Sequence, residues 1–392
     1  MPLVDMKDML QHAHDHGYAV GAFDLLSLDF LQGIMAAAER ARAPVILSLS
    51  ESHFDDFDVE LMMPAVEAAA GRAAVPVAIQ LNHCAGLDSA VRGINRGCNG
   101  VIVDVSHQSP LDPVASSREI VTMAHACGVP VEGELGYLLE GEGAERHPGK
   151  IADTTVAEVQ TYVEETGVDF LAVSVDCVTG KPTLDWQRLK QINEALGIPL
   201  VIQGASGLSD DQFRRLIGSG VAKINDDTVL ADIAGATIRN AAKSCHDSGY
   251  TALLASVREA IATEAEQGMR RWGSAGRAAE VLSCCRSWTP VEHLIIYNVE
   301  GLDETGVERM MAEGRRMLGA IPGVREVVTG KAVQEKAKYR YTWLVRFCHP
   351  AVIDSYREHP DHVAFADELF RPVAGKQRIS IDYQSVETVF SM

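Results

Sequence analysis

The sequence is poor in basic residues and has no long apolar run. Its 35 Lys and Arg are outnumbered by 54 Asp and Glu, which gives a formal net charge of −19. Nonspecific nucleic-acid binding needs a basic surface, so nucleic acid is not expected as a partner. No apolar stretch approaches the roughly 18 residues of a membrane-spanning helix. Residues 1–17 are polar and rich in histidine, unlike a signal peptide, so no membrane partner is expected.

Two patterns that would indicate other classes of protein are also missing. The eight cysteines are scattered, without a C-x-x-C pair or the spacing of a disulfide framework. Their distribution predicts a location in the reducing cytoplasm. No G-x-G-x-x-G follows the first strand-like run, as it would in a doubly wound dinucleotide-binding sheet. A doubly wound sheet without that motif is the second choice of fold.

The sequence does contain a regular alternation of strand-like and helical segments. Hydrophobic residues make up 47% of the chain, and eight short apolar runs recur with helical stretches between them. The runs are residues 19–23, 45–49, 77–81, 101–105, 129–135, 170–175, 200–203 and 222–225. Such alternation indicates βαβ units with a parallel sheet. Eight units predict an α/β fold, a (β/α)8 TIM barrel.

The pattern changes near residue 285, where we predict the boundary between two domains, residues 1–285 and residues 286–392. Just before it, residues 273–276 (Gly-Ser-Ala-Gly) have the composition of a flexible segment. The predicted elements of the second domain are strand 293–299, helix 304–320, strands 324–331 and 341–347, a broken helix 351–370 and strand 378–383. This order predicts an α+β, ferredoxin-like domain.

Polar residues lie at the ends of the predicted barrel strands. They include Asp24, Ser50, Asn82, His83, Asp104, Glu132, Glu134, Gln203 and Asn225. The carboxyl ends of barrel strands form one face, where binding and catalytic residues gather, although each residue could instead only hydrogen-bond a nearby loop. Residues 204–207 (Gly-Ala-Ser-Gly) precede a predicted helix, and together with residues 225–228 they favour binding of an anion such as phosphate.

Six stretches of residues 1–285 resemble the class II, zinc-dependent ketose-bisphosphate aldolases. They are G-Y-A-V-G-A-F-D (17–24), A-P-V-I-L (43–47), V-E-G-E-L-G (131–136), E-E-T-G-V-D (164–169), G-A-S-G-L (204–208) and V-A-K-I-N-D-D-T (221–228). The resemblance implies that Asp104 and Glu134 lie near a metal. It also implies that Glu142, on a mobile loop, moves the proton of an enediolate.

The same resemblance implies a site for a dihydroxyacetone-phosphate-like group. The residues at the matching positions are Gly180, Gly204, Ser206, Gly207, Asn225, Asp227 and Thr228. Asp24, Ser50 and Gln203, at strand ends, are further candidates for substrate binding. Lys181, next to Gly180, could hold a phosphate or form a Schiff base, or it could be a solvated loop charge.

The sequence departs from this family at the catalytic and zinc-binding positions. Asn82 occupies the position of an Asp that transfers a proton, and an amide cannot act as a general base. Of three zinc-binding histidines only His83 is retained, because Thr179 and Gln203 occupy the other positions. A catalytic zinc needs three good protein ligands, so we expect a zinc-independent mechanism. Other candidate ligands around His83 are Glu134, Cys84 and Cys177.

Residues 291–388 resemble the stress-responsive dimeric α/β-barrel (Dabb) family. The resemblance is carried by E-H-L-I (292–295), I-P-G-V (321–324), F-C-H-P (347–350) and S-Y-R-E-H-P-D-H-V-A-F-A-D (355–367). It implies a ferredoxin-like domain that pairs with a second copy. In a cyclase of this family, matching Tyr and His positions perform an aldol condensation, and the corresponding residues here are His293, Tyr356, His359 and His362. We favour a dimer-forming role over a catalytic one.

The combined prediction is a cytoplasmic, aldolase-like enzyme that forms a homodimer or higher homo-oligomer. It would act on a small, phosphorylated keto or hydroxy compound by carbon–carbon lyase or related enolate chemistry. Two alternatives stay open. One is an aldol cyclase or condensation enzyme that uses Tyr356 and His362 of the C-terminal domain, and the other is a non-catalytic, sugar-phosphate-binding homologue.

Overall fold

The computed structural model describes residues 2–53, 58–103, 113–135, 155–174, 186–203, 207–226, 228–244, 249–374 and 378–384. By their internal contacts, the parts of the chain form two compact units. One consists of Met1–Leu87, Cys98–Val121 and Pro130–Ser287, and the other of Asp88–Gly97, Thr122–Val129 and Trp288–Met392. Among the described helices, none is both long and apolar enough to cross a membrane.

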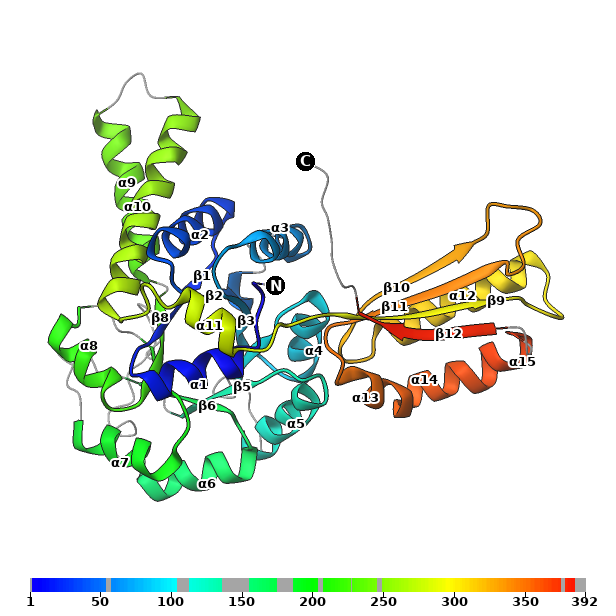
Figure 1. Cartoon of the computed structure of the whole chain (residues 1–392), viewed down its shortest axis with the longest axis horizontal. Helices are drawn as coiled ribbons and strands as arrows, with labels where there is room; N and C mark the ends of the chain where they lie inside the picture. Colours follow the sequence, from blue (N-terminus) through cyan, green and yellow to red (C-terminus); the bar gives the residue numbers. More distant parts are fainter. Residues whose placement is uncertain are drawn as a thin grey trace. The chain divides into compact units, whose positions relative to one another are not determined.

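Eight parallel strands close into a barrel in the order of the sequence, which confirms the predicted TIM barrel (Figure 1). They are β1 (Val20–Asp24), β2 (Val45–Ser50), β3 (Val77–Cys84), β4 (Gly100–Val103), β5 (Val131–Leu135), β6 (Phe170–Ser174), β7 (Leu200–Gln203) and β8 (Val221–Asp226). Pairing of β1 with β8 closes the barrel, and Val20 lies opposite Lys223 there. The strands are apolar along most of their length because strands of a barrel are buried on both faces.

Helices alternate with the strands along the chain. They are α2 (Leu28–Ala41), α3 (Val59–Arg72), α4 (Leu87–Arg96), α5 (Pro113–Ala126), α6 (Val156–Thr166), α7 (Trp186–Leu196), α8 (Asp210–Ile217), α9 (Thr228–Ser244) and α10 (Tyr250–Arg271). A short helix, α11 (Ala278–Cys284), ends this part of the chain. The order of βα units is the one that the alternating pattern predicts.

The N-terminal helix α1 (Met6–His16) closes the amino-terminal end of the barrel. It begins at Asp5, whose carboxylate accepts hydrogen bonds from two backbone amides, and it ends at Gly17 in the left-handed conformation. Its apolar side chains pack in one cluster with residues from the first halves of the strands, among them Val20, Ile46 and Val201. Helix α11 also contacts α1 and adds Val281 to this cluster.

The glycine-rich stretch at residues 273–276 is not a flexible linker, and the sequence-based expectation for it was wrong. The amide of Gly276 donates to the carbonyl of Ala41 at 2.8 Å, and Ser274 is fully buried. Gly273 and Gly276 both have positive φ angles, which a glycine adopts without strain. The stretch is therefore an ordered turn that leads from α10 to α11.

The C-terminal unit contains a four-stranded antiparallel sheet with the order β10-β11-β9-β12. Its elements are β9 (Val291–Tyr297), α12 (Glu304–Gly319), β10 (Val324–Lys331), β11 (Tyr341–Phe347), α13 (Val352–Glu358), α14 (Pro360–Ala364), the π-helical turn η2 (Phe365–Phe370), α15 (Arg371–Ala374) and β12 (Arg378–Tyr383). This β-α-β-β-α-β order confirms the predicted ferredoxin-like arrangement.

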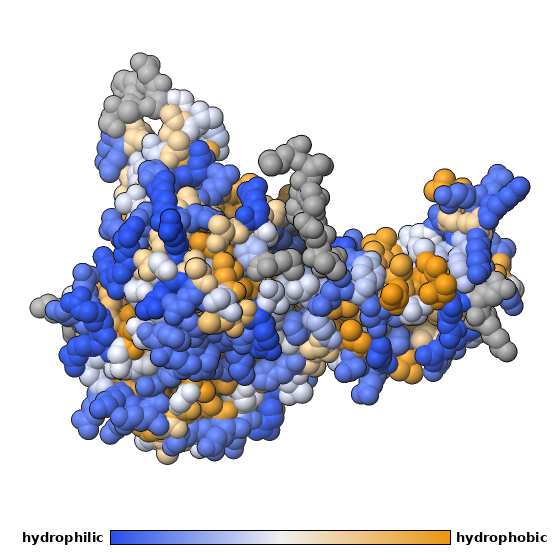
Figure 2. Space-filling model, in the orientation of Figure 1, coloured by the Kyte–Doolittle hydropathy of each residue, from blue (hydrophilic) through white to orange (hydrophobic). Residues whose placement is uncertain are grey.

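One face of this sheet is packed and the other is not. Trp343, Val345 and Phe347 of β11 point to the packed face and are buried. Side chains alternate along a strand, so the intervening residues point to the opposite face. There, Val328, Leu344, Leu294 and Ile381 lie opposite one another across the four strands. Val328 and Ile381 are 40% and 53% exposed, and Figure 2 shows apolar surface on this domain.

Candidate functional site

The candidate site begins at the carboxyl end of β3, where Asn82, His83 and Cys84 continue the strand three residues beyond the predicted run. His83 has a φ of 52°, an uncommon conformation for a residue other than glycine. The pairing of β3 with β4 is irregular between Leu81 and Cys84. Such a bulge re-aims side chains at the end of a strand and is common beside functional sites.

Asn82 is held by a carboxylate from the first strand. Its Nδ2 atom donates to Oδ1 and Oδ2 of Asp24 at 3.3 and 3.4 Å, and both side chains are buried. A carboxylate accepts hydrogen bonds, so this contact decides which end of the amide is nitrogen. The Oδ1 atom of Asn82 is then a buried acceptor that has no hydrogen-bond partner among the described residues.

His83 lies beside the carboxylate of Glu134 on β5. Its Nδ1 atom is 3.7 Å from Oε2 of Glu134, and the glutamate side chain is almost fully buried. Gln203, at the end of β7, is buried too, and its Nε2 atom has no hydrogen-bond partner in the part of the chain that is described. Ser50, at the end of β2, lies opposite Asn82 and shares a hydrogen bond with Ser52 at 2.8 Å.

The described side chains at the carboxyl end of the barrel do not form a zinc site of three histidines. Gln203 offers an amide in place of an imidazole, and His83 is accompanied by one carboxylate, Glu134. Cys84 is buried beside them, but His83, Glu134 and Cys84 are not among the groups of three ligands that lie within 4.8 Å of one another in the described residues. A zinc ion needs three good ligands, so no step is assigned to one here.

A second buried network lies beneath these residues in the barrel interior. Nζ of Lys223 is 2.6 Å from Oε2 of Glu132, and both side chains are fully buried. Nε2 of Gln80 donates to the same oxygen at 3.1 Å. Burial lowers the pKa of Lys223, against the attraction of Glu132. Glu132 is therefore an interior residue that joins β5 to β8, not a rim residue as its sequence position suggested.

The pairing of Lys223 with Glu132 was not predicted, although the sequence contains a signal for it. Glu132 and Lys223 are charged residues with apolar or glycine neighbours on both sides in the strand, at positions before the polar strand ends. Charged side chains are almost never fully buried unless they are paired, so each one required a partner inside the barrel. The sequence does not state which residue that partner is.

The predicted phosphate site is only partly described. Gly207 has a φ of 84°, and helix α8 begins after Ser209, whose side chain caps it together with Gln212. Asn225 on β8 has a buried side-chain amide with no hydrogen-bond partner among the residues described, and Thr228 is exposed at the start of α9. The other predicted residues of the barrel lie outside the described residues: Asp104, Glu142, Cys177, Thr179, Gly180, Lys181, Gly204, Ser206 and Asp227.

Three of the four candidates in the C-terminal domain come together. The ring centroids of Tyr356 and His362 are 4.4 Å apart, and those of His293 and Tyr356 are 6.3 Å apart. Nδ1 of His293 lies 2.5 Å from Oδ1 of Asp382, a partner that sequence analysis did not single out. Burial raises the pKa of Tyr356 and lowers that of His362.

The fourth candidate, His359, has a structural position. Its Nδ1 atom accepts a hydrogen bond from the backbone amide of Asp361 at 3.2 Å, which caps helix α14. Pro360 follows as the first residue of that helix, where its missing N–H costs nothing. Nδ1 of His359 therefore stabilises the start of α14, where the chain leaves α13.

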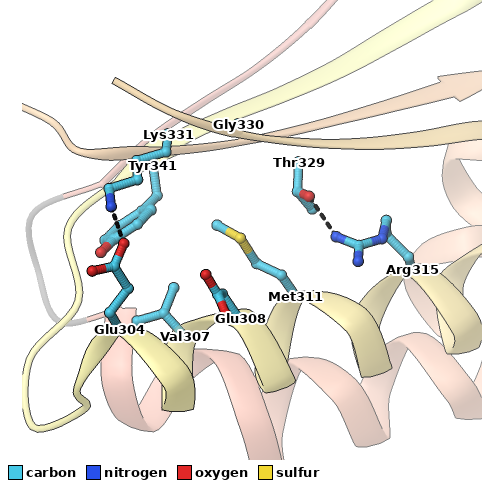
Figure 3. Close-up of a pocket in the computed structure, with 9 residues that line it drawn as sticks. All are labelled: Glu304, Val307, Glu308, Met311, Arg315, Thr329, Gly330, Lys331 and Tyr341. Carbon is cyan, nitrogen blue, oxygen red and sulfur yellow. Dashed lines mark hydrogen bonds and ion pairs between the residues drawn. The ribbon is translucent and has the colours of Figure 1, made fainter. Parts of the chain in front are cut away.

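A pocket of about 220 Å³ lies elsewhere in this domain, between α12 and strands β10 and β11 (Figure 3). Glu308 and Met311 line it, and Arg315 donates to the hydroxyl of Thr329 at 2.6 Å. At its other end, Lys331 pairs with Glu304. It contains none of the predicted catalytic residues, and its charged side chains are already paired in part.

Two family models match different parts of the chain. Residues 4–277 match the family model described as "Fructose-bisphosphate aldolase class-II", and residues 291–385 match "Stress responsive A/B Barrel Domain". A probable fructose-bisphosphate aldolase of Bacillus subtilis is 35% identical over 287 residues, which are 71% of this chain and 100% of the relative. A fructose-bisphosphate aldolase of Staphylococcus epidermidis is 34% identical over 289 residues, with the same shares of both chains.

Solved structures of aldolases are similar to about 70% of the chain. The YdjI aldolase from Escherichia coli K12 aligns with a TM-score of 0.62 and 29% identity, over 70% of this chain and 99% of that chain. A putative fructose-1,6-bisphosphate aldolase from Coccidioides immitis aligns with a TM-score of 0.61 and 27% identity, over 69% of this chain and 97% of that chain.

Proposed function

The chain belongs to the class-II fructose-bisphosphate aldolase family, with a stress-responsive α/β-barrel domain after the barrel, and from this premise we propose a modified lyase. The barrel would act on a small phosphorylated keto or hydroxy compound by carbon–carbon lyase or related enolate chemistry, without a three-histidine zinc site. The observation that carries the proposal is the group Asp24, Asn82, His83, Glu134 and Gln203, gathered from four strands at the carboxyl end of the barrel.

Asn82 binds the substrate in this proposal and moves no proton. Its Nδ2 atom is occupied by Asp24, so the buried Oδ1 atom accepts a hydrogen bond from a substrate hydroxyl. A family member with Asp at this position could take the proton of that hydroxyl, whereas an amide cannot. Proton exchange next to a carbonyl is therefore favoured over complete cleavage that depends on a base at Asn82.

His83 and Gln203 supply donors for the substrate carbonyl. Nδ1 of His83 lies 3.7 Å from the carboxylate of Glu134, which orients the ring, and Gln203 has a buried N–H donor at the end of β7. Donors fixed before the reaction stabilise the negative charge that develops on an enolate oxygen. Glu142, by the family resemblance, would move the carbon-bound proton.

The function is tested by proton exchange on a phosphorylated ketone. The purified protein should accelerate incorporation of deuterium from D2O into dihydroxyacetone phosphate, followed by NMR, and a chelator should not abolish the exchange. Gly207→Val should raise KM by about tenfold, equivalent to about 1.4 kcal/mol of binding, because a side chain there blocks the anion site.

Gly197→Val is the matched control for Gly207→Val. Gly197 also has a positive φ and open space around the position of a Cβ atom, but it precedes β7, at the amino-terminal end of the barrel. The Gly197→Val substitution introduces the same backbone strain away from the anion site, so KM should stay at the wild-type value. Absence of exchange, or an equal change in both variants, would refute this assignment.

The C-terminal domain supports a second candidate function. Asp382 holds Nδ1 of His293, and Nδ1 of His362 donates to the carbonyl of Arg357 at 3.1 Å, so each ring has its Nε2 atom left for other contacts. A tyrosine beside two oriented histidines is suited to proton transfer at an enolising carbonyl. This arrangement favours an aldol cyclase or condensation activity. A non-catalytic, sugar-phosphate-binding role for the chain is the third alternative.

We also propose that the unpacked sheet face of the C-terminal domain pairs with a second copy. The row Val328, Leu344, Leu294 and Ile381 is apolar across all four strands. Substitution Leu294→Glu should therefore lower the molar mass of the full chain measured by light scattering, because a carboxylate would be buried in the two-fold contact.

Val333→Lys is the control for the pairing experiment. Val333 is 95% exposed and lies between β10 and β11, outside the apolar row. This variant should keep the molar mass of the wild type. A wild-type chain that is monomeric, or a Leu294→Glu variant that assembles as the wild type does, would contradict the proposed contact.

A further inference from the structure

A group of metal-ligating side chains lies at the opposite end of the barrel from the candidate site. His12 and His16 are one helical turn apart on α1, which places both rings on the same face of the helix. The rings stack with centroids 4.0 Å apart and an interplanar angle of 13°. Glu280 approaches them from α11, with Oε1 at 3.5 Å from Nε2 of His12 and 3.8 Å from Nε2 of His16.

Each of the three side chains is held by a further contact on its other polar atom. Nδ1 of His16 lies 2.8 Å from the carbonyl oxygen of His12 and must donate to it, so Nε2 of the neutral ring has a lone pair. Nδ1 of His12 shares a hydrogen bond of 2.9 Å with the hydroxyl of Tyr18. Oε2 of Glu280 accepts from Arg277 at 2.9 Å. Such outer contacts orient the ligands of metal sites.

A polar atom of the buried His12 ring lacks a hydrogen bond to the described residues, which is costly. The His12 side chain is 6% exposed, and its Nε2 atom has no hydrogen-bond partner within the described part of the chain. Nε2 of His12 and Nε2 of His16 both face Oε1 of Glu280, at 3.5 and 3.8 Å. In the tautomers whose Nδ1 atoms carry the hydrogen, both Nε2 lone pairs point towards this oxygen, and a cation between the three atoms would bind all of them.

We infer that His12, His16 and Glu280 bind a divalent transition-metal ion. Two imidazole nitrogens and one carboxylate oxygen suit Zn²⁺ and Co²⁺ better than Mg²⁺ or Ca²⁺, which prefer oxygen ligands. The three ligand atoms lie within 4.8 Å of one another. His16 and Glu280 are 45% and 37% exposed, so water can complete the coordination on the outer side.

The ion would join two segments that are far apart in the sequence. Helix α1 closes the amino-terminal end of the barrel, and α11 follows the last barrel helices. A metal that binds the folded chain and not the unfolded one adds to stability by mass action. In barrels, this end usually serves stability whereas catalysis occurs at the other end. The site is thus a structural clamp, independent of the proposed reaction.

The inference is tested on the full chain without a histidine tag, after removal of bound metal with a chelator. Titration calorimetry with ZnCl2 and absorption spectra with CoCl2 should show one ion per chain. His16→Gln and Glu280→Gln should each weaken binding by at least about tenfold, since each removes one ligand or its charge. His16 and Glu280 are part-exposed, so both variants should fold, which circular dichroism checks.

Two control variants locate the ion. His83→Ala removes the histidine at the opposite end of the barrel, and His125→Ala removes an exposed histidine on α5. Both should bind one ion with the affinity of the wild type. No binding by the wild type, or binding that is lost in His83→Ala and kept in His16→Gln, would overturn the inference. The proposed lyase function is judged separately, by deuterium exchange.

Discussion

Replacement of Lys223 by methionine should lower the free energy of unfolding by about 3–5 kcal/mol, the usual cost of removing one partner from a buried ion pair. The Nζ atom of Lys223 lies 2.6 Å from Oε2 of Glu132, and neither side chain is exposed. Methionine fills a similar volume, so the loss comes mainly from the carboxylate that stays buried without its cation. Urea denaturation followed by circular dichroism measures the change.

A second substitution separates the charge from the packing. Glu132→Gln in the Lys223→Met background should recover part of the lost stability, because it neutralises the unpaired carboxylate and can still accept from Gln80. Lys190→Met is the matched surface control, since Lys190 pairs with Glu194 on an exposed helix face. That variant should unfold at nearly the wild-type urea concentration. An equally small effect of Lys223→Met would contradict the role of the buried pair.

Glu142→Gln should slow deuterium exchange into dihydroxyacetone phosphate by about 10²- to 10⁴-fold, the range for loss of a general acid–base group. Glu142 lies between Gly141 and Gly143, and the resemblance to the aldolases implies that it is on a mobile loop. Such loops often deliver a catalytic group. The amide in the variant keeps the size and polarity of the side chain but cannot take a proton. KM should change much less than kcat.

The double variant Tyr356→Phe, His362→Ala decides which domain performs the reaction. If the barrel is the catalytic domain, this variant should exchange deuterium at the wild-type rate, because its substitutions lie in the other compact unit. If Glu142→Gln keeps full activity and the double variant loses it, the chemistry belongs to the C-terminal domain. The proposed barrel mechanism would then be wrong.

The main elements of both domains could be predicted from the sequence because each depends on a local pattern. Apolar runs separated by helical stretches predicted all eight barrel strands, and Asp5 and Gly17 define the ends of α1 as capping residues do. The position of His83 at the rim was predictable for the same reason, since polar residues follow an apolar run. The end of β3 was placed too early, because a bulge at His83 extends the strand without following the period of two.

The partners of the functional side chains were decided only by the tertiary structure. Asp24 orients the amide of Asn82 across 58 residues, and Glu132 meets Lys223 across 91 residues. These contacts depend on how the strands are registered and on closure of the barrel by β1 and β8. The same holds for Glu280, which reaches His12 only because α11 packs against α1. Local patterns specify helices and strands, whereas contacts between distant residues arise from packing that brings separate elements together.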